Sequence, residues 1–141
     1  MEIYFAGSIR GGRDGVDIYN QFINFLKGYG KVLTEHIGDK TLTNTGELIT
    51  DKEIYDRDVD WITKADVFIA ECSNPSLGVG YEICKAEHEN IMIIVLYKQS
   101  DKKLSAMING NERVNVIQYS SIEEAFKVLG EILLNLKEGE S

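Results

Sequence analysis

The stretch VFIAECSNPSLGVGYE, residues 67–82, decides the fold class. It starts with a continuous apolar run at 67–70, passes through a polar loop with glycines, and enters a segment that is expected to be helical over 78–89. A second continuous apolar run follows at 91–96. Strands that are apolar along their whole length are typical of a parallel sheet covered by helices on both faces. The stretch therefore predicts one strand–loop–helix unit of an α/β protein.

The rest of the chain repeats this alternation. Further strands are expected at 3–6, 31–34 and 114–119, and helices at 17–29, 47–64 and 122–136, with the last two strands following each other directly. The pattern predicts a doubly wound (Rossmann/flavodoxin-like), five-stranded, mainly parallel sheet with helices on both faces, built as a single domain over residues 1–141. Ligands of such sheets bind at the carboxyl ends of the strands, where the strand order reverses.

Composition excludes several classes of partner. The formal net charge is −8, with 23 acidic residues against 15 basic ones, which argues against nucleic acid and against an anionic membrane surface. No apolar run approaches the ~20 residues that span a bilayer, and no signal peptide precedes the first strand, so we expect a cytoplasmic protein. Cys72 and Cys84 stand apart from any metal-binding spacing. They are interpreted as buried thiols in a reducing compartment, and no metal site is expected.

A glycine-rich loop, GSIRGGRDG at 7–15, follows the first strand. It is neither a GxGxxG motif nor a Walker A loop, because Arg13 and Asp14 stand where that loop has Lys and Ser or Thr. Its glycines let backbone N–H groups approach an anion, Ser8 offers a hydroxyl, and Arg10 and Arg13 offer guanidinium groups. The alternative is a tight strand-to-helix turn with solvated arginines.

A second loop of this kind, PSLGVGYE at 75–82, follows the third strand. It brings Ser76, Gly78 and Gly80 to the start of a helix, where free N–H groups and the helix dipole favour an anion. Two such loops at one edge of the sheet suggest one anionic ligand between them, and the absence of a lysine-rich clamp suggests a single phosphate.

Two carboxylates lie in unusual positions. Asp58 falls on the same helical stripe as Ile54 and Ile62, and Glu82 follows the second glycine loop by one helical turn. Near a phosphate site the pair suggests glycosyl chemistry, in which a retaining mechanism places nucleophile and acid about 5–5.5 Å apart. Tyr4 on the first strand could orient one of them. The alternatives are that Asp58 pairs with a buried donor, that Glu82 complements the helix dipole and that Tyr4 is an ordinary strand aromatic.

The order and spacing of several segments carry a resemblance to a known family. They are YFAGSIRGGR, YGKVLTEH, DVDWITKADVFIAE, NPSLGVGYE and LSAMI. From Ile3 to about Phe126 the chain resembles the 2'-deoxynucleoside 5'-monophosphate N-glycosidases, within the nucleoside 2-deoxyribosyltransferase-like group. The resemblance implies hydrolysis of the N-glycosidic bond to a free base and 2-deoxyribose 5-phosphate, by a homodimer that needs no metal or organic cofactor.

The same resemblance implies the roles of individual residues. Glu82 would be the nucleophile that forms a covalent deoxyribosyl 5-phosphate ester, Asp58 would assist departure of the base, and Tyr4 would help to position Glu82. Contacts to the 5'-phosphate would come from Gly7, Ser8, Ile9, Arg10, Gly11, Gly12, Arg13, Ser76 and Gly78. Tyr19 and His36 would line the nucleotide site, and Ser105, Ala106 and Met107 would complete it from the second subunit.

Two other functions stay open on the sequence. A nucleoside 2-deoxyribosyltransferase passes the sugar to another base, but a transferase of free nucleosides gains nothing from Arg10 and Arg13. A non-catalytic nucleotide sensor on the same scaffold conflicts with Asp58 on an apolar stripe, because a buried acid without a task costs stability. The segment IGDKTLTNTGELIT at 37–50 departs from the family in content, so the sequence does not assign a preferred base.

Overall fold

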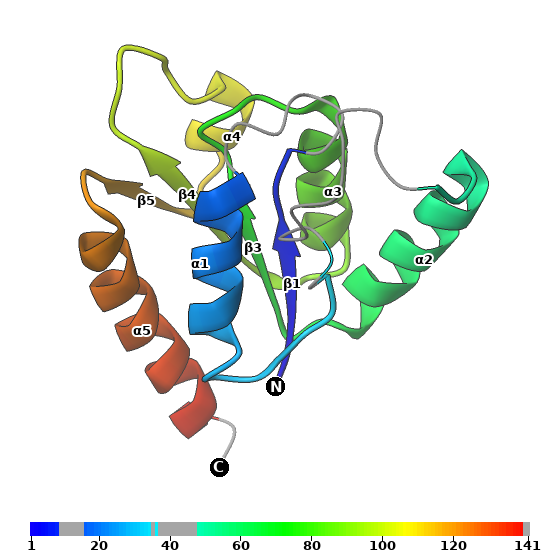
Figure 1. The fold of residues 1–141 in the computed structure, drawn as a ribbon, viewed down its shortest axis with the longest axis horizontal. Coiled ribbons are helices and arrows are strands. Elements are labelled where there is room, and N and C mark those ends of the chain that lie inside the picture. The colour runs from blue at the N-terminus through cyan, green and yellow to red at the C-terminus, as the bar shows by residue number, and fades with distance from the viewer. Residues whose placement is uncertain (9–15, 35, 37–47, 140–141) are drawn as a thin grey trace.

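A computed structural model describes residues 1–8, 16–34, 36 and 48–139. Strands and helices alternate along the chain (Figure 1). In chain order they are β1 (Glu2–Ala6), α1 (Val16–Leu26), β2 (Lys31–Val32), α2 (Asp51–Lys64), β3 (Val67–Glu71), α3 (Leu77–His88), β4 (Met92–Lys98), α4 (Ala106–Asn109), β5 (Val114–Tyr119) and α5 (Ile122–Gly139).

The sheet has five strands in the order β2-β1-β3-β4-β5, and every neighbouring pair is parallel. This confirms the predicted doubly wound α/β fold. The expected direct passage between the last two strands is wrong, because α4 lies between β4 and β5. Parallel neighbours cannot be joined by a tight hairpin, so the chain needs such a crossover. The strand order reverses between β1 and β3, which is where ligands bind in folds of this kind.

Two hydrophobic cores cover the two faces of the sheet. On β3, Val67 and Ile69 pack into the core beneath α1 and α5, whereas Phe68 and Ala70 pack into the core beneath α2 and α3. Figure 1 shows α1 and α5 together on one side of the sheet and α2 and α3 at the other side. Because alternate residues of a strand point to opposite faces, a strand covered on both faces is apolar throughout, as predicted for 67–70.

Three elements are shorter than the sequence pattern predicted: the helix expected over 17–29 ends at Leu26, and side chains account for the other two. The helix expected over 47–64 begins at Asp51, because Thr50 accepts a hydrogen bond from the Glu53 backbone N–H at 3.2 Å and the Glu53 carboxylate reaches back to the Thr50 N–H. This capping box fixes the start of the helix. The strand expected over 31–34 ends at Val32, and the Thr34 hydroxyl accepts from the Phe5 N–H at 2.9 Å.

Across the described residues, no helix has the length and apolar composition needed to cross a membrane.

Candidate active site

A tyrosine and a glutamate meet next to the β1/β3 switch point. Tyr4 on β1 is 1% exposed, stacks on Phe68 of β3 with ring centroids 5.1 Å apart, and donates its hydroxyl to Oε2 of Glu82 on α3. Burial and the nearby Glu82 carboxylate raise the pKa of Tyr4, so its phenol stays neutral and donates. The sequence suggested Tyr4 as an orienting group for one carboxylate, and the fold brings these two side chains into contact.

Glu82 lies in the second turn of α3, close to the helix start. Its Oε1 is 4.0 Å from the position that a Cβ atom on Gly78 would occupy. The pKa of Glu82 is raised to about 7, chiefly by burial; the hydrogen bond from Tyr4 lowers this pKa, the Asp58 carboxylate raises it, and the charge of Arg57 lowers it. A carboxylate that titrates near neutrality is typical of catalytic groups, although structural pairs can be shifted in the same way.

Asp58 lies on the inward side of α2, where its charge acts on both Tyr4 and Glu82. Its Oδ1 is 3.0 Å from Nε of Arg57, and both side chains are about one-fifth to one-quarter exposed. The neighbouring acids Asp56 and Asp60 instead pair with lysines on the exposed side of the helix. The alternative that Asp58 pairs with a buried donor is met only in part, because Arg57 is about one-quarter exposed, and the Asp58 charge also acts on Glu82.

Arg57 is a site residue that the sequence analysis missed. Its guanidinium carbon lies 4.7 Å from the ring centroid of Trp61, and its Nη2 lies 3.3 Å from Nε2 of His36. The His36 and Trp61 rings are 5.8 Å apart, so His36, Arg57 and Trp61 form one aromatic and cationic cluster beside Asp58. The i, i+4 spacing of Arg57 and Trp61 on the helix was the available signal, but an arginine next to an aspartate also looks like an ordinary solvated pair.

Gly7 and Ser8, the first residues after β1, pack against Tyr19 of α1. A Cβ atom on Gly7 would lie 2.9 Å from Cζ of Tyr19, so the close approach of this ring requires glycine. The Ser8 N–H donates to the Tyr19 hydroxyl at 3.0 Å. Tyr19 is 1% exposed, which places it beneath the loop as a support. The other predicted ligands of this loop, residues 9–13, lie outside the described residues.

The loop after β3 leads into the N-terminus of α3. Ser76 is the N-cap residue, and its hydroxyl accepts from the Val79 N–H at 3.3 Å. Gly78 follows in the first turn and is exposed. The predicted arrangement of a serine and a glycine at a helix start, one turn before Glu82, is therefore present, and the site lies at the positive end of the helix dipole.

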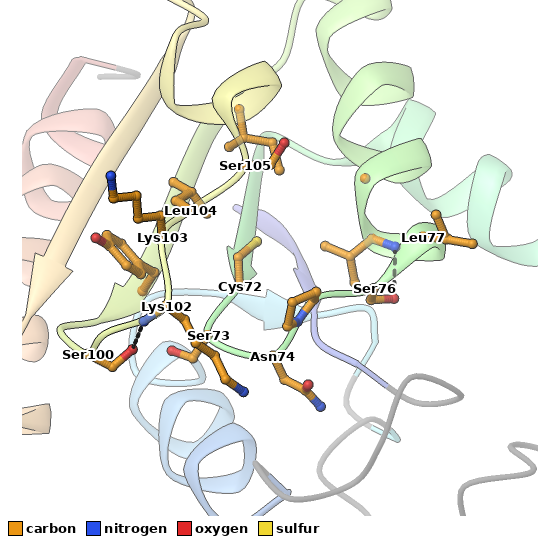
Figure 2. A pocket seen from close by; sticks show the side chains of 15 residues that line it. Cys72, Ser73, Asn74, Ser76, Leu77, Ser100, Lys102, Lys103, Leu104 and Ser105 are labelled. Carbon is orange, nitrogen blue, oxygen red and sulfur yellow. Dashed lines mark hydrogen bonds between the residues drawn. The ribbon is translucent and has the colours of Figure 1, made fainter.

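A cavity of 620 Å³ separates the loop after β3 from the segment before α4 (Figure 2). Ser76 and Leu77 line it on the α3 side, and Leu104 and Ser105 line it on the other. Ser105 is the N-cap residue of α4, and its hydroxyl accepts from the Met107 N–H at 3.3 Å. Ser105, Ala106 and Met107 are all exposed, which leaves them accessible to a second molecule.

The two cysteines differ in how far they are exposed to solvent. Cys72 is partly buried, so the prediction of a buried thiol holds only in part, and this burial raises the pKa of its thiol to about 12. The same prediction is wrong for Cys84, which is exposed on α3 because the helix turns that position away from the sheet. Both thiols are free. In the described part of the chain, no three His, Cys, Asp or Glu side chains are grouped so that they could hold a metal ion.

Comparison with known proteins gives related sequences over nearly the whole chain. Residues 3–120 match the family model described as nucleoside 2-deoxyribosyltransferase. A 5-hydroxymethyl-dUMP N-hydrolase from Tetraodon nigroviridis is 42% identical, with 97% of this chain and 100% of that protein covered. A putative 2'-deoxynucleoside 5'-phosphate N-hydrolase 1 from Syntrophotalea carbinolica is 42% identical over 94% of both chains. A 5-hydroxymethyl-dUMP N-hydrolase from Danio rerio is 48% identical over 88% of both.

Solved structures share the fold at lower sequence identity. The Clostridium botulinum CMP N-glycosidase BcmB superposes with a TM-score of 0.69 at 21% identity, covering 92% of this chain and 98% of that one. The solution structure of BlsM gives a TM-score of 0.68 at 20% identity, with 89% and 85% of the two chains covered. At this identity the likeness supports the fold alone.

Proposed function

The chain belongs to the nucleoside 2-deoxyribosyltransferase family, and within it we propose that this protein hydrolyses the N-glycosidic bond of 2'-deoxynucleoside 5'-monophosphates. The products are a free base and 2-deoxyribose 5-phosphate. Relatives that are 42–48% identical over most of their length are named as N-hydrolases of such nucleotides. The observation that carries the proposal is the contact of Tyr4 with Glu82 beside Asp58, at the switch point of the sheet.

The proposed reaction proceeds in two displacements at C1' of the sugar. A Glu82 oxygen attacks C1', the C1'–N bond breaks, and its electron pair leaves with the base, which takes up the proton that Asp58 donates. Asp58 assists this departure. A water molecule then attacks C1' of the glycosyl–glutamate ester, its proton passes to Asp58, and the Glu82 carboxylate is released. Two inversions at C1' give net retention of configuration.

Tyr4 has a positioning role in this mechanism. Its neutral hydroxyl donates to Oε2 of Glu82, which fixes the carboxylate plane and leaves Oε1 for attack. The hydrogen bond also lowers the pKa of Glu82 and so keeps a larger ionised fraction at neutral pH. The Arg57 charge also lowers the pKa of Glu82.

We assign the 5'-phosphate to the two glycine loops. Ser76 and Gly78 at the start of α3 supply one side, where the helix dipole favours an anion, and Gly7, Ser8 and residues 9–13 supply the other. Binding energy from this remote group is used at C1', so losing the phosphate should reduce the rate as well as the affinity. The His36, Arg57 and Trp61 cluster beside Asp58 is assigned to the base side of the sugar.

A homodimer with shared sites is part of the proposal. Leu77 is 98% exposed and Met107 is 85% exposed, and Tyr81 of α3 is half exposed beside Tyr55 of α2, with ring centroids 6.2 Å apart. Such exposed apolar side chains favour burial against a second copy. In this arrangement Ser105, Ala106 and Met107 of one subunit complete the site of the other, and Ser105 contacts the 5'-phosphate bound there.

We further propose that residues 1–141 act as one domain in the cytoplasm, where free thiols persist.

The activity is tested by chromatography of released base. The panel contains dUMP, 5-hydroxymethyl-dUMP, the other deoxynucleoside monophosphates, their ribo counterparts and the unphosphorylated deoxynucleosides. We expect base release from deoxynucleoside monophosphates, with kcat/KM at least tenfold lower without the phosphate. Equal values with and without phosphate, or transfer of the sugar to an added second base in place of hydrolysis, would support the transferase alternative. Binding of nucleotides without any base release would support the sensor.

The shared site is tested by mixing two inactive variants. Glu82→Ala and Ser105→Asp homodimers are unfolded and refolded together in equal amounts, and subunit exchange is verified by native mass spectrometry. If Ser105 serves the partner's site, each mixed dimer has one intact site, and roughly a quarter of all sites regain activity. If Ser105 serves its own chain, no intact site forms and the activity stays at baseline.

A further inference from the structure

A second carboxylate lies buried at the carboxyl edge of the sheet, apart from the Tyr4–Glu82 pair. Glu71 ends β3 and is 2% exposed. Its Oε1 accepts the Ser73 N–H at 2.7 Å, and its Oε2 accepts the Ser73 hydroxyl at 2.7 Å and the hydroxyl of Tyr119 from β5. A buried carboxylate costs free energy unless donors satisfy it, and here three donors converge on its two oxygens.

Ser73 connects this carboxylate to a second loop. While its hydroxyl donates to Glu71, the same oxygen accepts the Lys98 N–H at 2.8 Å, at the end of β4. Lys98 begins the segment that runs to Ser105, and Cys72 makes a neighbouring link by donating its N–H to the Leu96 carbonyl at 2.8 Å. Ser73 therefore ties the loop after β3 to the loop after β4, and its side chain is one of those lining the cavity between them (Figure 2).

Both loops lead directly to residues assigned to the phosphate. Ser76 is three residues beyond Ser73, a span of at most about 10 Å of extended chain, and Pro75 restricts the backbone between them. Ser76 then caps α3, which carries Gly78 and Glu82. On the other wall, Ser105 caps α4. A shift of Ser73 would therefore pass to the start of α3 and to the segment before α4 together.

We propose that Glu71 and Ser73 are positioning residues that hold the loop after β3 and the loop after β4 in register with each other, without touching the substrate themselves. The inference rests on the proposed function, because it takes Ser76 and Ser105 as phosphate contacts. In a dimer with shared sites, one Glu71–Ser73 unit would set Ser76 for its own site and Ser105 for the partner's site. The phosphate geometry of both sites would then depend on each such unit.

This role predicts a selective defect. Ser73→Ala removes the hydroxyl between Glu71 and Lys98 but leaves Glu71 with the residue 73 N–H and the Tyr119 hydroxyl. The carboxylate keeps two of its three donors, so the fold should survive. The loops lose their shared link, and binding of the phosphate should weaken while binding of the sugar and base does not.

The test compares dUMP with 2'-deoxyuridine by titration calorimetry, in a Glu82→Gln background so that dUMP is not consumed. Adding Ser73→Ala should weaken dUMP binding about tenfold and change 2'-deoxyuridine binding by less than twofold. Ser73→Thr keeps the hydroxyl and should restore dUMP binding. Ser120→Ala is the matched control, since the Ser120 hydroxyl donates to Gln99 in the loop after β4 but does not link this loop to the loop after β3. Glu71→Gln has one acceptor oxygen in place of two, so it cannot accept the Ser73 N–H and the Ser73 hydroxyl on separate oxygens as the carboxylate does. It should reproduce the defect.

Two results would overturn the positioning role. One is a Ser73→Ala protein that binds dUMP within twofold of its parent. The other is an equal loss for dUMP and 2'-deoxyuridine, which is what general destabilisation gives. Failure of the proposed function is seen separately, because a protein with Ser73 and Glu82 intact would then release no base from dUMP, whatever the calorimetry shows.

Discussion

Two tyrosine–glutamate pairs lie at the same edge of the sheet, on opposite faces. Tyr4 donates to Glu82 in the core under α2 and α3, and Tyr119 donates to Glu71 in the core under α1 and α5. Glu71 receives two further hydrogen bonds from Ser73. Glu82 receives a hydrogen bond from Tyr4 alone among the described residues, and the neighbouring Asp58 charge raises its pKa.

In the proposed function, this difference separates a structural carboxylate, Glu71, from a reactive one, Glu82. A carboxylate that accepts three hydrogen bonds, as Glu71 does, is held in place and has most of its lone pairs occupied. A carboxylate with one donor, a raised pKa and an oxygen facing a helix N-terminus remains available for a new bond. The same two residue types thus serve different purposes because their surroundings supply different numbers of donors.

The largest expected effect is on catalysis at Glu82. Glu82→Gln keeps the shape of the side chain but removes the nucleophile, so base release from dUMP should fall by at least about a thousandfold. Chromatography of released base measures the rate, and circular dichroism verifies the fold. A folded variant with near-normal turnover would refute the assignment of the nucleophile.

Removal of the Tyr4 hydroxyl should give a smaller catalytic loss with a shift in pH dependence. Wild-type kcat/KM should rise with pH through about 7, as Glu82 ionises. Because the Tyr4 hydrogen bond lowers the pKa of Glu82, Tyr4→Phe should move this midpoint upward and reduce the rate about 10- to 100-fold at pH 7. The unphosphorylated deoxynucleoside serves as a control substrate without a titrating phosphate. An unchanged midpoint would mean that Tyr4 does not act on Glu82.

Stability should change in the opposite direction to activity. The folded pKa of Glu82, about 7, lies above its ordinary value of 4.5, so the folded state binds more protons between these pH values and loses stability as pH rises through them. Glu82→Gln removes this penalty and should stabilise the protein by about 3 kcal/mol at pH 8 but very little at pH 4. Urea unfolding at the two pH values measures the effect. A variant that is less stable than wild type at pH 8 would contradict it.

The smallest effect is expected at the second tyrosine. Tyr119→Phe leaves Glu71 with both Ser73 donors but removes one hydrogen bond from a buried carboxylate, which should cost about 1–2 kcal/mol in the free energy of unfolding. Because the link through Ser73 persists, kcat/KM for dUMP should stay within about twofold of wild type. A large catalytic loss in a stable Tyr119→Phe protein would remove the distinction between the two pairs.

Much of the fold could be predicted from the sequence because a continuous apolar run identifies a buried strand without reference to distant residues. The run at 67–70 and the loop-to-helix passage at 75–82 identified the sheet edge at which Tyr4 and Glu82 meet. The four-residue helix α4 was missed because so short a segment shows no helical periodicity. The start of α2 was placed too early, although Thr50 followed by Glu53 three residues later is a recognisable capping box that marks a helix start.

The missed site residues depend on distant partners. Glu71 looks like an ordinary polar residue at the end of a strand, and its burial follows from Tyr119, which lies 48 positions further along. Arg57 is positioned by a contact with His36, which lies on another segment of the chain. Cys84 was expected to be buried from the average behaviour of cysteine, whereas its exposure depends on the rotation of α3 against the sheet.

The central claim is that Glu82 attacks C1' and forms a covalent intermediate, and the stereochemistry of methanolysis tests it most directly. Base release from dUMP is carried out in water containing methanol, and the methyl 2-deoxyriboside 5-phosphate that forms is examined by NMR. Two displacements at C1' predict the β anomer, the configuration of the starting nucleotide, and no product with Glu82→Gln. The α anomer would show a single inversion and would contradict a Glu82 nucleophile.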